Sequence, residues 1–364
     1  MKLIEKYLAV FILFSIQTTF SSCNGQSNTD NTRTQLKQKS ISSNATELDP
    51  KAIVIYQDKK DNLWFVSKEN GVYKYDGKNL VLFTSNDGLC SYSILSVQED
   101  NNGNLYFDTP NGVCKYDGQK FTTLTVTEND KSKNEWKSEP NDLWFRMGWE
   151  HNGPFRYDGK NLYHLEFPKN KMEDEFYKKY PNISYNPYGI YSLFKDSKGN
   201  IWFGTCNFGI YLFNGKEISW MYENQLTQTP KGGDFGIRSI AEDKEGNYWI
   251  CNANYKYTLL PNDTEGSGLK SINYKRKIGI ENKEDLYFLS ILTDNNGDMW
   301  MTTFDQGVWR NNGKELKQFF IKTDGIDISP TSMYKDNQGI IWLGTDKYGI
   351  YKYNGKTFKK FKIK

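Results

Sequence analysis

The sequence has few of the residues that metal and nucleophile chemistry usually requires. It contains two histidines and five cysteines in 364 residues. Neither His151 nor His164 lies in an H-E-x-x-H, nucleophile-elbow or Cys/His metal-binding pattern. We therefore predict no metal site and no cofactor, and the sequence favours a binding function over catalysis.

The sequence also lacks a large excess of charge of either sign. The chain carries 47 Lys and Arg against 44 Asp and Glu, and neither sign forms a long block. Proteins that bind nucleic acid need a basic patch to neutralise the phosphates. Nucleic acid is therefore not an expected partner.

The N-terminal part differs from the rest of the chain. Two lysines precede a short apolar run at residues 8–16, which is typical of a signal peptide. The stretch Phe-Ser-Ser-Cys that ends at Cys23 resembles the lipobox of bacterial lipoproteins, and an ordinary secretory signal is the alternative. The resemblance implies a signal peptide over 1–22, lipidation of Cys23, and a membrane-anchored protein of the cell envelope on the periplasmic or outer-membrane surface. Residues 23–50 are polar and predict a disordered tether.

Internal repeats decide the architecture. The segment DSKGNIWFGTCNFGIYLFNG at 196–215 recurs as DNQGIIWLGTDKYGIYKYNG at 336–355. Weaker copies give seven anchor aromatics, which are Trp64, Tyr106, Trp144, Trp202, Trp249, Trp300 and Trp342. In all copies but the fifth, an Asp-Gly or Asn-Gly hairpin signal follows the anchor. A period near 40 residues is typical of propellers.

Each repeat unit is interpreted as four short strands joined by tight turns. The aromatic content of 16% favours strands. A lone four-stranded sheet cannot bury both of its faces, whereas sheets packed radially bury every face between neighbours. We predict an all-β fold, a single seven-bladed β-propeller of four-stranded antiparallel blades over 51–364, with an open sandwich as the alternative.

The pattern D-x-x-G-x-x-W-x-G-T…G-(I/V)-Y-x-(Y/F)-(D/N)-G resembles the two-component regulator propeller repeat over residues 51–364. In that family the repeats often form periplasmic sensors of hybrid histidine kinases, some of which respond to oligosaccharides. No kinase sequence follows the repeats here, so the resemblance implies a stand-alone lipoprotein version of the sensor part.

The Asp-x-x-Gly turns raise the question of calcium. They begin at Asp100, Asp196, Asp243, Asp294 and Asp336. Calcium sites need six or more oxygen ligands from a longer loop. We expect hairpin turns in which Asp caps backbone amides and Gly takes a positive φ.

Candidate site residues occur where repeats depart from their own pattern. Two residues after the anchor, Asp108 and Arg146 stand in adjacent blades, either as a structural ion pair or as a charged lip of the channel. The following loop of blade three is long and holds Trp149 and His151. The matching loops of other blades supply Asn207, Phe208, Asn252, Asn254, Phe304, Asp305, Asp346 and Tyr348.

Aromatic side chains mixed with amides and carboxylates favour a ligand-binding mouth. The expected partner is a small molecule or oligosaccharide, or an envelope protein. One alternative is a metal-assisted lyase or hydrolase that uses His151 and Glu150, since propeller lyases of the virginiamycin B type share this architecture. A structural scaffold in an envelope complex is a second alternative.

The sequence leaves two further structural questions open, which are the conformation of one insertion and the state of four cysteines. Residues 169–180 have helix-forming composition with apolar residues spaced by four, and predict a short helix over the rim or a solvated insertion. Four cysteines, Cys90, Cys114, Cys206 and Cys251, lie within the repeats, where either disulfides or free thiols are compatible with the sequence.

Overall fold

The computed structural model describes residues 42–127, 136–230, 232–233, 236–261, 268–283 and 285–363. All of them belong to the compact unit that spans residues 40–364. The predicted signal peptide, Cys23 and residues 23–41 of the predicted tether lie outside the described residues.

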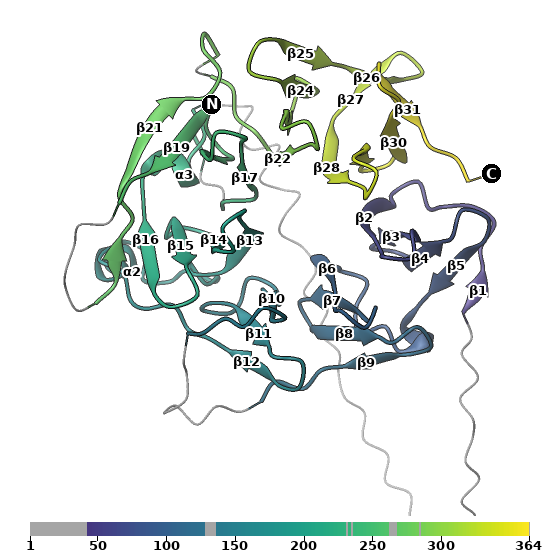
Figure 1. Cartoon of the computed structure of the whole chain (residues 1–364), viewed down its shortest axis with the longest axis horizontal. Helices are drawn as coiled ribbons and strands as arrows, with labels where there is room; N and C mark the ends of the chain where they lie inside the picture. The colour runs from purple at the N-terminus through teal and green to yellow at the C-terminus, as the bar shows by residue number, and fades with distance from the viewer. Residues whose placement is uncertain are drawn as a thin grey trace, which may run out of the picture. The chain divides into compact units, whose positions relative to one another are not determined.

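Seven antiparallel sheets follow one another around a ring, so the predicted seven-bladed β-propeller is confirmed (Figure 1). Blades one to three contain β2 (Ile53–Gln57), β3 (Leu63–Ser67), β4 (Gly71–Tyr75) and β5 (Leu80–Phe83); β6 (Ser96–Glu99), β7 (Leu105–Thr109), β8 (Gly112–Tyr116) and β9 (Phe121–Thr123); and β10 (Leu143–Phe145), β11 (Phe155–Tyr157) and β12 (Leu162–His164). Blade three thus has three strands in the described part of the chain.

The second half of the ring is built in the same way. Blades four to seven contain β13 (Ile190–Lys195), β14 (Ile201–Thr205), β15 (Ile210–Phe213) and β16 (Ile218–Met221); β17 (Ile240–Glu242), β18 (Tyr248–Ile250), β19 (Tyr255–Leu259) and β21 (Tyr274–Ile278); β22 (Ser290–Thr293), β23 (Met299–Thr302), β24 (Val308–Asn311) and β25 (Leu316–Phe319); and β28 (Pro330–Lys335), β29 (Ile341–Thr345), β30 (Ile350–Tyr353) and β31 (Phe358–Lys360).

Short elements decorate this frame. They are β1 (Ser43–Asn44), η1 (Ser85–Asp87), α2 (Glu173–Lys179), α3 (Asn224–Thr227), β20 (Lys270–Ser271) and the hairpin of β26 (Ile321–Thr323) and β27 (Ile326–Ile328). Helix α2 confirms the short helix that the sequence predicts within residues 169–180. Strand β1 pairs with β5, so residues 42–50, which resemble a tether in composition, are packed against blade one.

The anchor aromatics form the cores between blades. In six blades the anchor side chain donates a hydrogen bond to an Asp six residues earlier in the chain. The other carboxylate oxygen of this Asp accepts backbone N–H groups of the turn, as Asp336 does from Gln338 and Ile340. The Asp turns are therefore hydrogen-bonded hairpins, as expected, and each one also holds its anchor.

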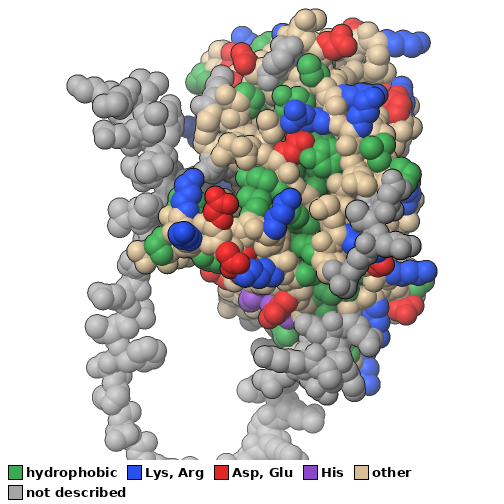
Figure 2. Space-filling view, turned by 90° about the vertical axis from the view of Figure 1, so that its left-hand side faces the viewer, with side chains coloured by type: hydrophobic (Ala, Val, Ile, Leu, Met, Phe, Trp, Pro, Cys, Tyr) green, Lys and Arg blue, Asp and Glu red, His purple; other side chains and the backbone are tan. Residues whose placement is uncertain are grey.

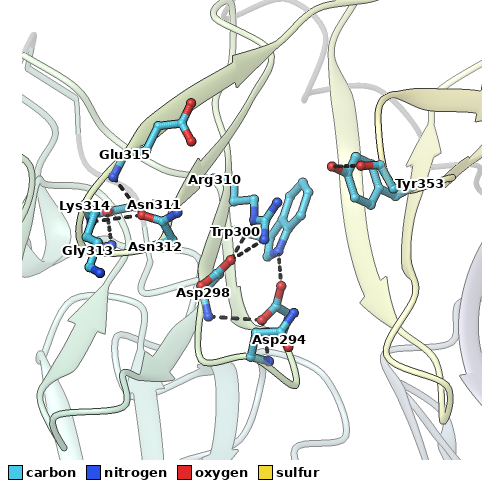
Figure 3. A network of polar contacts seen from close by, with 12 residues as sticks. Asp294, Asp298, Trp300, Arg310, Asn311, Asn312, Gly313, Lys314, Glu315 and Tyr353 are labelled. Atoms are coloured by element: carbon cyan, nitrogen blue, oxygen red, sulfur yellow. Dashed lines mark hydrogen bonds and ion pairs between the residues drawn. The ribbon is translucent and has the colours of Figure 1, made fainter.

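A cation lies opposite most anchors. The residue paired with the anchor across to the next strand is Lys or Arg in six blades, and Leu212 in blade four. Figure 3 shows this arrangement in blade six, where Asp294 binds the indole of Trp300 and Arg310 lies beside the same ring, 5.4 Å from its centroid. Asp298 in turn pairs with Arg310.

The ring closes without a shared strand between its two ends. The Gln57 N–H donates to the Tyr334 hydroxyl at 2.7 Å, and the Asn337 N–H donates to the Gln57 side chain at 2.7 Å. Phe361 after the last strand stacks on Phe65 of blade one. On the side of the molecule shown in Figure 2, positive and negative side chains are interspersed.

Candidate ligand-binding surface

The loops between the second and third strands of the blades define one face of the propeller, which we call the loop face. The Asp turns between the first and second strands define the opposite face, which we call the turn face. All of the predicted ligand-binding residues belong to the loop face or to the strand ends that lead into it.

Asp108 and Arg146 meet, as the sequence allowed. Their charged atoms approach to 4.0 Å, and Asp108 also accepts the backbone N–H groups of Arg146 and Met147. Burial raises the pKa of Asp108, although the Arg146 guanidinium opposes this rise. Arg146 further donates to the backbone carbonyls of Leu95 and Tyr191 in the two neighbouring blades. The pair therefore links blades two, three and four.

Three more of the predicted residues have roles inside the fold. Phe208 is fully buried in the core between blades three and four. Asn252 takes a φ of 78° and donates to two backbone carbonyls, while Asn254 binds Ile280 through both its oxygen and its nitrogen. These side chains shape the loops from within and are not exposed to a ligand.

The remaining predicted residues are accessible. Trp149 is 41% exposed and Phe304 is 58% exposed, and both stand on loops of this face. Asp305 and Asp346 are exposed, and Asn207 and Tyr348 are half-buried. The loop face therefore offers aromatic rings, amides and carboxylates to solvent.

Trp149 belongs to an aromatic cluster that the sequence did not reveal. Its ring lies 5.7 Å from that of Tyr191, at the start of β13. Burial raises the pKa of Tyr191, and the charge of Arg238 opposes the rise. Tyr185, in the segment before β13, is 45% exposed. We call Trp149 and Tyr191 the aromatic platform.

The residues of the catalytic alternative lie next to this platform. The His151 ring is 4.9 Å from Phe155 and 5.6 Å from His164. Burial lowers the pKa of both histidines, so both are neutral near pH 7. Glu150 raises the pKa of His151 by a smaller amount. In the described ranges no three His, Cys, Asp or Glu side chains come together in a way that could hold a metal ion.

A separate hollow opens near the turn face, and the sequence did not indicate it. It has a volume of about 210 Å³ and lies between blades two and four, on the inner side of β10. Its lining includes Gln98, Asn101, Asn141, Trp144 and Lys195. We call it the blade-three cavity. A neighbouring hollow of about 280 Å³ shares Asn101 and Asn141 with it.

Comparison with known families agrees with the repeat pattern. Residues 184–207 and 325–347 match the model of the family described as two component regulator propeller. Both segments run through an Asp turn to just past an anchor aromatic. The resemblance noted in the sequence is therefore confirmed for these repeats. No curated protein matches the chain in sequence.

Several solved structures share the fold. The extracellular domain of the one component system BT4673 from B. thetaiotaomicron is 23% identical, with a TM-score of 0.54 over 85% of this chain. This chain spans only 39% of that structure. Virginiamycin B lyase from Staphylococcus aureus is 15% identical, with a TM-score of 0.57 over 85% of this chain and 97% of the lyase.

A third similar structure is PorZ, a surface component of the type-IX secretion system of Porphyromonas gingivalis. It is 15% identical, with a TM-score of 0.52 over 83% of this chain and 44% of PorZ. At these identities the likenesses show the fold alone, because one propeller fold hosts unrelated functions.

Proposed function

We propose that this chain, which carries two component regulator propeller repeats, is a non-catalytic ligand-binding propeller of the cell envelope. Its ligand is an oligosaccharide or a similar small molecule, bound at the loop face on the aromatic platform. The protein is held at the membrane by a lipid on Cys23.

The observation that carries the proposal is the exposed ring of Trp149. Trp149 is 41% exposed, so its ring is available for a ligand to stack on. The ring contacts that of Tyr191 at a centroid distance of 5.7 Å. Sugar rings have one apolar face and a rim of hydroxyls, so an exposed aromatic ring complements the apolar face.

The envelope location is supported by cysteine chemistry and by the similar structures. Cys90 and Cys114 form a disulfide, whereas Cys206 and Cys251 are not disulfide-bonded. Disulfides persist in oxidising compartments outside the cytoplasm. The similar BT4673 structure is an extracellular domain. None of the helices in the described ranges is long and apolar enough to cross a membrane.

The test of binding uses thermal shift and calorimetry of the full chain with a panel of oligosaccharides. A ligand stabilises the fold by mass action, so a hit raises the melting temperature. We expect Trp149→Ala to weaken binding about tenfold or more, because buried aromatic anchors dominate such interfaces. Phe320→Ala removes a ring of similar exposure outside the platform and serves as the matched control.

The outcomes separate this proposal from its alternatives. Turnover of a bound ligand that is lost in His151→Ala, with binding retained, would replace the proposal by a lyase or hydrolase. Binding that is equally strong in Trp149→Ala would remove the platform from the account. If no oligosaccharide of the panel binds and the wild-type chain captures an envelope protein, the result would favour a structural scaffold in an envelope complex. Release of Cys23→Ser from the membrane fraction tests the anchor separately.

A further inference from the structure

Blade three lacks an innermost strand among the described residues. In the other blades the anchor strand lies between an inner strand and a third strand, whereas β10 pairs only with β11. The chain approaches this blade along its outer side. The Thr127 N–H donates to Leu162 of the outermost strand, and Trp136 stacks on Phe167. The blade-three cavity lies at the inner edge of β10.

The inner edge of β10 is covered by side chains instead of a strand. The Gln98 side chain donates to the Trp144 carbonyl, and its oxygen accepts the Trp144 N–H at 3.4 Å. In blade seven the equivalent anchor Trp342 is paired with Tyr334 of β28. In blade three, the side-chain amide of Gln98 therefore takes the position that a backbone peptide group of the inner strand has in blade seven.

Lys195 lines the cavity at the end of β13 and has no ion-pair or hydrogen-bond partner in the described part of the chain. Its equivalent in blade seven is Lys335, since the two residues pair with Ile201 and Ile341 at matching positions. The Lys335 ammonium donates at 2.9 Å to the carbonyl of Thr293, the last residue of the inner strand of blade six. Lys195 is placed to do the same for an inner strand of blade three, which the described residues do not contain.

Asn101 completes the pattern from the other side of the cavity. In other blades, the residue that follows the turn Asp donates its backbone N–H to a side chain of the next blade. The acceptor is the side chain of the last residue in that blade's inner strand. Three such bonds occur, from Lys59 to Glu99, from Ser197 to Glu242 and from Asn337 to Gln57. Asn101 holds the equivalent position in blade two and lines the cavity.

We propose that the blade-three cavity binds an extended peptide segment of another polypeptide, which pairs with β10 as the missing inner strand. Recognition of this kind uses main-chain hydrogen bonds for affinity and side-chain pockets for specificity. The Lys195 ammonium binds a carbonyl near the end of the segment. Its last side chain is Glu or Gln, which accepts the Asn101 N–H, and apolar side chains before it pack near Leu193 and Ile201 of the cavity lining.

This site is distinct from the aromatic platform, and it goes beyond the ligand-binding function proposed above. The groups that would hold the peptide come from three consecutive blades. Asn101 belongs to blade two, Trp144 to blade three and Lys195 to blade four. A bound strand would therefore contact three consecutive blades.

The test uses a fluorescent peptide with the sequence of residues 93–99, which includes the inner strand of blade two and ends in Glu99. Its binding to the full chain is measured by fluorescence anisotropy. We expect Lys195→Met to weaken binding about fivefold or more through loss of a charged hydrogen bond. Lys335→Met, whose ammonium already has a partner in blade seven, is the matched control and leaves binding unchanged.

Two further variants bear on the main-chain pairing. Gln98→Ala in the protein removes the side chain that occupies the β10 edge, so we expect tighter binding. A peptide with proline in place of its own Gln98 lacks the N–H opposite Trp144, and we expect it not to bind. Hydrogen exchange of the wild-type chain with the peptide should slow at Trp144.

Several results would overturn the proposal. They are no binding to the wild-type chain or to Gln98→Ala at millimolar peptide, equal effects of Lys195→Met and Lys335→Met, or slowed exchange only on the loop face. Binding that appears only after residues 128–135 are replaced by a Gly-Ser linker would assign the cavity to this chain itself. Dimerisation through β10 in place of peptide uptake would assign it to a second copy.

Discussion

Blade seven and blade three contain the same anchor in different surroundings. In blade seven, Asp336 binds the Trp342 indole at 2.7 Å and joins the inner strand to the anchor strand. In blade three, the position six residues before Trp144 is Ser138, and no inner strand precedes β10 in the described ranges. The difference teaches what the repeated Asp does. It fixes the turn that brings the first and second strands of a blade together.

Blade three compensates for this loss with charge. Asp142 and Arg156 form an ion pair at 3.0 Å in which both side chains are almost fully buried. The equivalent pair in blade six, Asp298 and Arg310, is drawn in Figure 3. It is more exposed than the pair in blade three. Asp108 and Arg146 add a second buried pair that reaches into both neighbouring blades. The irregular blade is therefore held by electrostatic contacts where the regular blade uses a strand.

The largest change in stability is expected when one of these buried ion pairs is broken. Arg156→Met should lower the free energy of unfolding by about 3–5 kcal/mol, because Asp142 is left as a buried, unpaired charge. Arg310→Met, at the matching position of blade six, should cost about 1 kcal/mol since its pair is partly solvated. Guanidinium unfolding of the full chain measures both, and equal losses would remove the distinction between the blades.

The next effect tests the Asp turn itself. Asp336→Ala should cost about 3 kcal/mol, because two backbone N–H groups and the Trp342 indole lose their acceptor. Ser138→Ala at the same repeat position of blade three should change stability by less than about 0.5 kcal/mol. Thermal and denaturant unfolding provide the check, and a large loss in Ser138→Ala would show that blade three has a hidden equivalent of the clamp.

A smaller effect concerns the substitute for the inner strand. Gln98→Leu should cost about 1–2 kcal/mol, because the peptide group of Trp144 loses its partner in a half-buried setting. Gln119→Leu on an exposed turn of the same blade is the control, and we expect no measurable change. Equal stability of both variants in denaturant unfolding would mean that Gln98 does not support β10.

The smallest effect depends on pH. Burial lowers the pKa of His151 and His164 in the folded protein, so the unfolded chain binds more protons as the pH falls below about 6.5. The stability contributed by the neutral rings is therefore present above that pH and is lost as the pH falls through the lowered pKa. We expect the difference in melting temperature between pH 7.5 and pH 5.5 to shrink in the double variant His151→Gln, His164→Gln. An unchanged difference would contradict the lowered pKa values.

Much of the fold could be predicted because each repeat carries its own local signals. The anchors and the Asp-Gly or Asn-Gly turns mark strand positions by spacing alone, and seven copies specify seven blades. The turn Asp could be recognised as a cap but not as the acceptor of the anchor indole. That bond joins two strands of the finished sheet, so only the folded geometry reveals it.

The candidate site was less predictable, because burial within a loop depends on tertiary packing. Phe208 and Asn254 resemble Phe304 and Asn207 in sequence, yet the first two point into the fold and the others reach solvent. Tyr191 lies in a strand, so no loop position of the repeat marks it as a neighbour of Trp149. The absence of an inner strand among the described residues of blade three had one signal in the sequence, which is the loss of the turn Asp at Ser138.

The measurement that tests the comparison most directly is amide hydrogen exchange at the two anchors. The Trp342 N–H lies inside the ladder of blade seven, whereas the Trp144 N–H has only the side chain of Gln98 at 3.4 Å. Exchange reports local opening, so we predict that Trp144 exchanges at least about tenfold faster than Trp342 in the isolated protein. Equal protection at both anchors would contradict the account, because it would mean that a strand already covers β10.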